Sequence, residues 1–374
     1  MSELNIIRNF ASIDNEANEV IKAVAEIGKH AMCRDFSKSG LVEKFSVDGE
    51  YNEKAEQAKI AVLKFCGKKA GITEFSKKAD VIRAFENRNF ADIYNSIMVG
   101  ALESIVLKAK PEQILRLANI ISVDVGDSYT WEIDTKGLPI AQRASYTSNV
   151  AFLDGHSKSA ITITPKPYSI GTSMDYIRIL DGSYDMGVEI ARVAMGLLYA
   201  QLKLIVLGIY STTPLTGTPL YQATFDATKY IQMGSDIAML NGGSAVTAYG
   251  TLPAFHAIGV VATTNYGFQS QDEMIREGFL GRAHGIDNVV IDQLTDLSAP
   301  FIDANAEDLR LVPNDKIVLL SSVGDKPAKL VRENFIRVKV KEAADGAEYR
   351  YDYKYFMSFD AAIATQAHYG IQAV

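Results

Sequence analysis

Residues 184–209 read YDMGVEIARVAMGLLYAQLKLIVLGI, and the rest of the chain can be organised around this stretch. Its apolar residues recur every three or four positions, which predicts a helix with one continuous apolar stripe. Asp181 and Ser183 stand just before it, where a side-chain oxygen can accept the first free amides. At 1.5 Å per residue the helix would be roughly 39 Å long, well beyond the ordinary three turns. We therefore expect a rigid rod against which other elements pack.

The same helix could also be interpreted as a membrane span, because residues 193–209 are apolar apart from Gln201 and Lys203. A span needs about 20 apolar residues, and a lysine at the bilayer centre costs about 3 kcal/mol. We therefore expect a buried helix and no membrane. Its apolar side should pack on strands late in the chain, and its polar residues Glu189, Arg192 and Lys203 should face solvent or a neighbouring subunit.

Composition narrows the class of protein. The chain has 374 residues with a net charge of −7, which argues for solubility and against a surface that coats nucleic acid. Cys33 and Cys66 are too few for a disulfide framework and fit a reducing compartment. The first residues, MSELNIIR, lack the basic-then-apolar pattern of a signal peptide, so we expect folding in a cytoplasm.

The chain changes character at Pro111. Residues 1–110 read as charge-mixed helices, which suits a small helical domain or a bundle of arms with solvated faces. Beyond Pro111, alternation predicts strands at 117–125, 129–134 and 160–165. The organisation that we predict is a helical region followed by three further segments, at residues 1–110, 111–221, 222–333 and 334–374.

Residues 126–169 form a long two-stranded excursion with a polar tip. An isolated hairpin is at best marginally stable in water and cannot bury its apolar face on itself. We expect a neighbouring subunit to cover it; the alternative is a flexible active-site or surface loop. The candidate intersubunit contacts in this excursion are Trp131, Lys136, Arg143 and Lys158.

The second half mixes helices and strands. Residues 224–240 predict a helix with Asp226 or Thr224 as its cap and a glycine stop at 242–243. Residues 246–261 contain strand-like pieces, 269–280 predict a helix, and 286–291 and 317–320 predict strands. Tyrosines on every second residue of 349–355 predict an aromatic row on one sheet face, opposite a strand at 336–340 across an Asp345-Gly346 turn.

Catalytic chemistry has little support in the residues. The five histidines are spread without metal-ligand spacing, and no phosphate-binding glycine loop occurs. Gly155, His156 and Ser157 weakly resemble the start of a nucleophile elbow, but the second glycine of that motif is absent. Asp287 and Asp292 flank a strand and are best interpreted as solvated acids. We expect no enzyme and no catalytic, cofactor or metal site.

The order of these elements resembles the bacteriophage major capsid proteins of the Hong Kong 97 type, over most of residues 111–374. The excursion at 126–169 resembles that family's extended loop, and the helix at 184–209 resembles its spine helix. Two further stretches also resemble the sequences of these shell proteins: residues 277–291, EGFLGRAHGIDNVVI, and residues 312–320, VPNDKIVLL. The resemblance implies an α+β fold with a peripheral domain, an axial domain, an extended loop and an N-terminal arm.

The family further implies self-assembly of pentamers and hexamers into an icosahedral shell around double-stranded DNA, with the DNA as a non-specific neighbour. Portal, scaffold and decoration proteins would be additional partners, and the location would be the virion capsid after assembly in the host cytoplasm. Some members lose an N-terminal scaffold segment; we expect residues 1–110 to be retained. Some members cross-link through a loop lysine. Lys136 and Lys158 have no identifiable partner, so we expect no cross-link.

Three alternatives stay open. One is the shell protein of an encapsulin-like nanocompartment, a related fold whose members are usually shorter and lack a helical N-terminal region. Another is a different phage structural protein, such as a tail component. The last is an enzyme with an unrecognised site.

Overall fold

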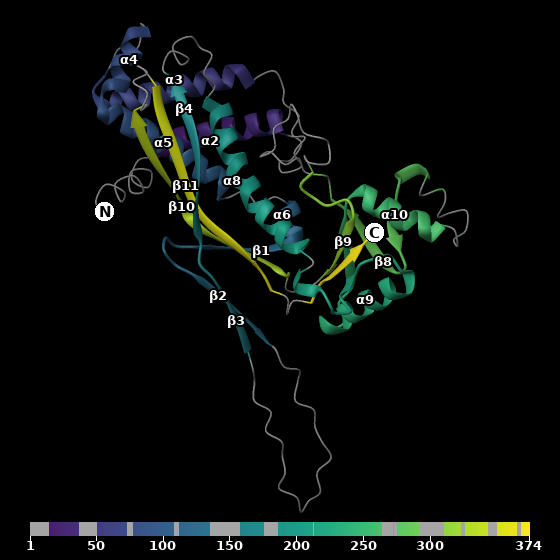
Figure 1. Ribbon diagram of the computed structural model, residues 1–374. Helices are drawn as coiled ribbons and strands as arrows, with labels where there is room; N and C mark the ends of the chain where they lie inside the picture. The colour runs from purple at the N-terminus through teal and green to yellow at the C-terminus, as the bar shows by residue number, and fades with distance from the viewer. Residues whose placement is uncertain are drawn as a thin grey trace, which may run out of the picture.

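The computed structural model describes residues 15–36, 51–72, 78–107, 112–134, 158–175, 186–211, 213–263, 272, 275–291, 293, 310–322, 326–342, 350–364 and 368–374. The described strands include a four-stranded sheet and a six-stranded sheet. In Figure 1 the first sheet lies with the N-terminal helices at one end of the molecule, and the second lies at the other end. The long helix α8 (Met186–Ile209) runs from the first end towards the second. The expected α+β class is confirmed.

Helix α8 begins two residues later than residue 184 and ends where the sequence predicts. By length and composition it could cross a membrane, but 67% of its most apolar window is buried inside the protein. Of its polar residues Arg192 is exposed, whereas Glu189 and Lys203 are half-buried. The prediction that all three face outward is therefore only partly right, because this helix is covered on more than one side.

The four-stranded sheet, in the order β1-β10-β11-β4, covers one side of α8. Its strands are β1 (Ala118–Val123), β10 (Ala328–Glu342), β11 (Arg350–Ile363) and β4 (Lys166–Asp175). Strand β1 is parallel to β10, and the other neighbours are antiparallel. The expected strand at 117–125 is shortened at both ends. The short helix α6 (Glu112–Leu117) precedes it, and a turn in which the Asp127 amide donates to the Asp124 carbonyl follows it.

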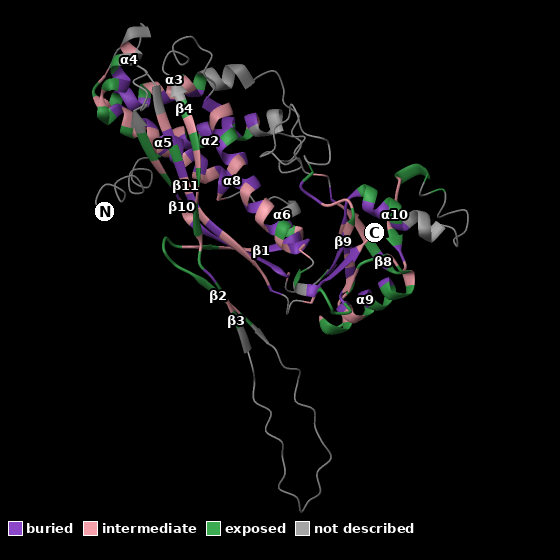
Figure 2. Ribbon diagram, in the orientation of Figure 1, coloured by how far each residue is buried: buried purple, intermediate pink, exposed green. Residues whose placement is uncertain are grey.

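The tyrosine row on β11 faces α8. Tyr353, Tyr355 and Met357 are all buried, and the Met357 sulfur lies 3.7 Å from the Gln201 amide nitrogen of α8. The alternate residue Lys354 is exposed, as period-two alternation requires. Figure 2 shows this division between buried and exposed residues along the strands. The predicted aromatic face is therefore confirmed for the described part of the strand.

The N-terminal helices cover another side of α8. They are α2 (Asn15–Phe36), α3 (Tyr51–Ala70), α4 (Lys78–Glu86) and α5 (Arg88–Val106). Their buried residues join the residues of α8 in one hydrophobic core. The charged residues of α2, such as Glu19 and Lys22, are exposed, so the solvated face that the sequence predicted is present. The apolar sides of these helices lie in the common core, so they are not separate arms.

The second sheet has the order β5-β12-β9-β6-β8-β7. Its strands are β5 (Tyr221–Gln222), β12 (Gly370–Ala373), β9 (Lys316–Ser321), β6 (Val246–Gly250), β8 (Ile286–Val290) and β7 (Arg282–Ala283). The C-terminal strand β12 lies between β5 and β9. The sequence did not predict this strand, because its short apolar run has no alternating pattern.

Helices α9 (Ala227–Leu240) and α10 (Leu252–Thr263) belong to this second part, and a short 3-10 helix, Thr213–Leu215, precedes them. The Asp226 carboxylate accepts the Thr228 and Lys229 amides at 2.9 and 3.2 Å, so the predicted cap of α9 is confirmed. The strand-like reading of 246–261 holds only for β6. Pro253 fits the first turn of a helix, where its missing amide costs nothing.

Candidate assembly interface

Strands β2 (Tyr129–Asp134) and β3 (Lys158–Ile163) form a separate antiparallel hairpin that projects from the body of the subunit (Figure 1). Its register places Tyr129 opposite Ile163 and Trp131 opposite Ile161. The predicted excursion is therefore present as two strands. Its tip, residues 135–157, lies outside the described residues.

The two faces of the hairpin differ because residues directly opposite each other share a face. One face bears the apolar pairs of Tyr129 with Ile163 and Trp131 with Ile161. The other face is polar, and the Thr130 and Thr162 hydroxyl oxygens lie 2.9 Å apart across the strands. The hairpin thus has an apolar face that needs a cover and a polar face that does not.

The subunit covers this apolar face at its root. The Tyr129 and Trp131 rings are in edge contact with centroids 4.6 Å apart, and the Lys329 ammonium of β10 lies 5.8 Å from the centre of the Trp131 ring. Ile163 is buried and the Lys329 side chain is fully buried beneath the hairpin. A cation over a tryptophan face is worth about 0.5–2 kcal/mol, so the ring and the ammonium fix the root on the sheet.

The cover is incomplete. Trp131 and Ile161 are only half-buried, and Tyr129 is 36% exposed although it faces Ile163. In a protein with a continuous core elsewhere, this is an aromatic surface that the subunit leaves partly open. This surface is therefore a candidate for contact with another subunit.

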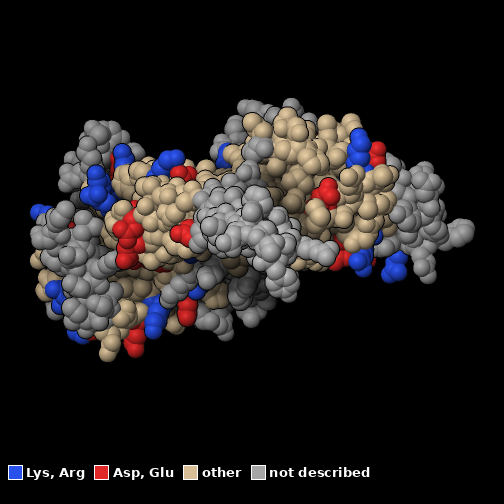
Figure 3. Space-filling view, turned by 90° about the horizontal axis from the view of Figure 1, so that it is seen from below, with Lys and Arg blue, Asp and Glu red and all other residues tan. Residues whose placement is uncertain are grey.

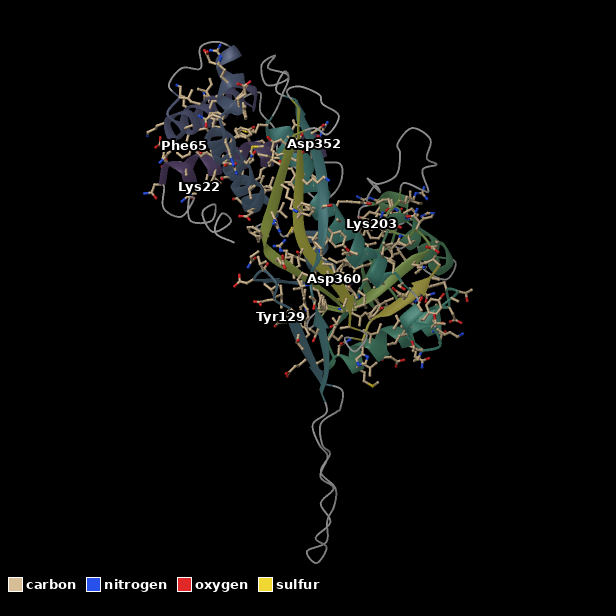
Figure 4. The ribbon with its side chains drawn as sticks, turned by 60° about the vertical axis from the view of Figure 1, so that its left-hand side comes forward. Lys22, Phe65, Tyr129, Lys203, Asp352 and Asp360 are labelled. Carbon is tan, nitrogen blue, oxygen red and sulfur yellow. The ribbon has the colours of Figure 1, made fainter. Side chains whose placement is uncertain are left out.

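Both ends of the hairpin are anchored to the sheet. Before β2, the Gly126 amide donates to the Glu333 carboxylate of β10 at 3.0 Å, and Gly126 has a φ of 87°, which favours glycine. After β3, Lys166 pairs with Asp360 at 2.9 Å, and this hydrogen bond raises the pKa of Lys166. Figure 4 places Tyr129 and Asp360 close to this root. The anchors set where the hairpin leaves the subunit.

The four predicted contact residues have different outcomes. Trp131 lies on the apolar face of the hairpin. Lys158 is paired across the strands with Asp134, in the same alternation as Thr130 with Thr162. Lys136 and Arg143 lie outside the described residues. The intersubunit role of all four stays a prediction. Sequence reasoning missed Lys329, because nothing local to its strand indicates that a tryptophan about 200 positions earlier covers it.

The titratable residues that the structure describes give little support for a metal or catalytic site. They contain no group of three or more His, Cys, Asp and Glu side chains that could hold a metal. Burial lowers the pKa of His284 and His368, and Asp287 is paired with Arg282 at 3.4 Å. Burial also raises the pKa of the Cys66 thiol to about 12, which opposes its use as a nucleophile. In Figure 3 the basic and acidic side chains are interspersed rather than gathered by sign.

Comparison with known protein families decides the class. Residues 18–371 match the model of the family described as "SPbeta prophage-derived putative capsid protein YonB". The chain belongs to this capsid protein family. The sequence-based recognition of a phage capsid protein is thereby confirmed, and family membership gives the protein a structural role in a shell. The hairpin and the long helix that the sequence predicted are both present in the structure.

A search of curated proteins finds no match. Solved structures with a similar fold include the capsid of a native GTA particle, at 13% identity and a TM-score of 0.47, covering 70% of this chain and 89% of that one. The capsid of cyanophage P-SCSP1u gives 13% identity and a TM-score of 0.46, with 70% and 87% covered. The encapsulin complex of Synechococcus elongatus gives 11% and 0.40, with 72% and 89% covered. The capsid assignment rests on the family match alone.

Proposed function

We propose that this capsid protein is the major capsid protein of a phage, and that it assembles pentamers and hexamers into an icosahedral shell enclosing double-stranded DNA. The observation that carries the proposal is the hairpin β2–β3, whose aromatic face the subunit covers only at its root. A protruding element with an open apolar side is most simply completed by the next copy of the chain.

Such a contact joins one surface to a different surface on the neighbour. Head-to-tail contacts of this kind generate closed rings when the rotation between copies closes. The same hairpin can make the contact between neighbouring copies in both pentamers and hexamers if its root is fixed and its angle to the neighbour varies slightly. The anchors of Gly126 on Glu333 and of Lys166 on Asp360 supply the fixed root.

Each part of the fold has a proposed place in the shell. The four-stranded sheet with α8 corresponds to the peripheral domain, and the six-stranded sheet with α9 and α10 corresponds to the axial domain. The hairpin corresponds to the extended loop, including residues 135–157 at its tip. Trp131, Lys136, Arg143 and Lys158 remain the proposed contacts of this loop with the neighbouring copy.

DNA is proposed as a non-specific neighbour of the wall. A net charge of −7 favours a shell wall that binds the phosphate backbone of DNA only weakly. Portal, scaffold and decoration proteins are proposed as further partners, the virion capsid as the location, and the host cytoplasm as the place of assembly. The encapsulin-like alternative differs in its contents, which would be protein cargo in place of a genome.

Electron microscopy of the purified protein tests the proposal. Closed shells of uniform diameter are expected, and monodisperse monomers at high concentration under many conditions would contradict it. A matched variant lacking residues 136–157 should keep the secondary structure and cooperative unfolding of the subunit but fail to form regular shells. Protein cargo in particles purified from the native source would favour the nanocompartment alternative.

A further inference from the structure

The N-terminal helical layer, which we define as α2 to α5, meets the rest of the subunit along α8 and β10. At Gly28 the backbone of α2 comes so close that an added Cβ would lie 2.9 Å from Ile190 of α8 and 2.8 Å from Ile105 of α5. Both isoleucines are buried in the common core. Removing the layer would therefore expose apolar surface on α8, at a cost of about 25 cal/mol per Å².

A buried arginine reinforces this contact at one end of α5. Arg332 of β10 is 2% exposed, and its guanidinium donates to the carbonyls of Val106 at 3.1 Å and Leu107 at 2.6 Å. The last carbonyls of a helix have no partner within the helix, and the negative end of its dipole favours a cation. Arg332 also donates to the Ser122 hydroxyl of β1 at 3.3 Å. One side chain thus links α5 to two strands of the sheet.

A glutamate of the layer makes a second polar contact in the opposite direction. The Glu103 carboxylate of α5 accepts the Ile336 amide of β10 at 2.9 Å. The pairing of β10 with β11 shifts register between Arg332 and Ile336, and β1 ends opposite Glu333. The layer therefore satisfies a backbone amide where the sheet is irregular. An unsatisfied buried amide would cost about 1–3 kcal/mol.

We propose that α8 and β10 form a permanent docking surface for the chain's own N-terminal helical layer, which stays bound even when the chain is cut between α5 and α6. The apolar contact supplies affinity, and the two polar contacts fix the position of α5 on the irregular part of β10. The inference concerns the single subunit and goes beyond the proposed shell. A capsid protein built this way keeps the layer as part of its wall whether or not this connection is cleaved.

The test uses the full chain with a specific protease recognition sequence inserted after residue 109. After complete cleavage, gel filtration at roughly 1 M salt should show both pieces eluting together, because apolar contact and buried bonds are screened little by ions. Separation of the two pieces, with the larger one either soluble or aggregated, would overturn the inference. No shell is needed for this measurement, so its failure is distinguishable from a failure of the proposed function.

Variants of the cleaved protein test the two polar contacts. Labelled and unlabelled cleaved protein are mixed, and the exchange of the layer between them is followed by fluorescence. Arg332→Met should speed the exchange roughly 30-fold, because lost interface bonds act mainly on dissociation. Arg337→Met, at an exposed position of the same strand, is the matched control and should leave the rate unchanged.

Arg332→Lys is a second variant, for use if Arg332→Met does not fold. It keeps the positive charge but not the fork that reaches two carbonyls, so we expect roughly a tenfold faster exchange. Glu103→Gln keeps an oxygen that can accept the Ile336 amide, so its exchange should speed up less than that of Arg332→Met. Equal exchange rates for the Arg332 variants and for Arg337→Met would show that Arg332 does not hold the layer.

Discussion

Helix α8 and the hairpin β2–β3 are both apolar elements, but the subunit completes only one of them. Helix α8 is covered by the four-stranded sheet and by α2 and α5, and even its Gln201 is 1% exposed. Among the described residues of the hairpin, the apolar face meets the sheet at the root, where Trp131 lies over Lys329, and Tyr129 stays partly exposed. An apolar pattern therefore shows that an element needs a cover, and it does not show which part of the assembly provides it.

The two elements also differ in what they need from their surroundings. A helix satisfies its own backbone hydrogen bonds, so its neighbours are needed to bury side chains. A two-stranded hairpin satisfies half of its backbone groups, and its apolar side needs a cover from outside the hairpin. We therefore expect the stability of the hairpin to depend on assembly, and the folding of the single subunit to depend on α8.

The largest expected effect comes from removing the cover of α8. Deletion of residues 1–110 should abolish cooperative unfolding and leave aggregated protein, because the apolar side of α8 under α2 and α5 becomes exposed. The measurement is solubility together with thermal unfolding by circular dichroism. Deletion of 136–157 serves as the comparison and should leave a soluble, folded subunit. A soluble, folded product from the deletion of residues 1–110 would contradict the claim that the subunit depends on the cover of α8 more than on the hairpin.

The next effect separates buried from exposed positions on α8 itself. Leu202 is fully buried and Leu207 is 57% exposed on the same helix. Leu202→Ala should lower the free energy of unfolding by about 3 kcal/mol, whereas Leu207→Ala should change it by less than about 0.5 kcal/mol. Urea unfolding of the unassembled subunit measures both. Similar losses for the two variants would mean that α8 is not the two-sided core element described above.

A smaller effect on folding is expected at the hairpin root. Trp131→Ala removes the ring over Lys329 and should cost the subunit about 1–2 kcal/mol, while shell formation should fall much more. Light scattering during assembly and urea unfolding measure the two quantities separately. Ala160→Ser, at an exposed position on the polar face, is the control. If assembly falls only as far as stability does, Trp131 has a role within the subunit and none between subunits.

The smallest effect is a pH dependence inside the N-terminal helical layer. Burial raises the pKa of Cys66 from 9.0 to about 12, so the folded state favours the neutral thiol. This contribution to stability is fully present below pH 9 and is lost as the pH rises towards 12. The loss of thermal stability between pH 8 and pH 11 should therefore be smaller in Cys66→Ala. Equal losses in the two proteins would show that this thiol is not kept buried by the layer.

Much of the candidate interface could be anticipated from local pattern. Alternation located both strands of the hairpin, and the absence of a cover within the excursion pointed to a neighbour. The same pattern could not reveal that Lys329 lies under Trp131, because the two residues belong to strands far apart in sequence. Nor could it show that Arg332 caps α5, since a lone arginine in a strand has no local signature for that contact.

The amino-acid sequence by itself determined the elements whose cause is local. The length of α8 follows from helical spacing, the Asp226 cap of α9 from side-chain chemistry, and the buried row of Tyr353 and Tyr355 from period-two alternation. Only the tertiary structure decided which surfaces meet. It placed the N-terminal helices on α8 and the last strand in the second sheet. Packing brings together apolar faces and unpaired backbone groups that are distant in the chain. A local sequence pattern cannot indicate which distant segment will be the partner.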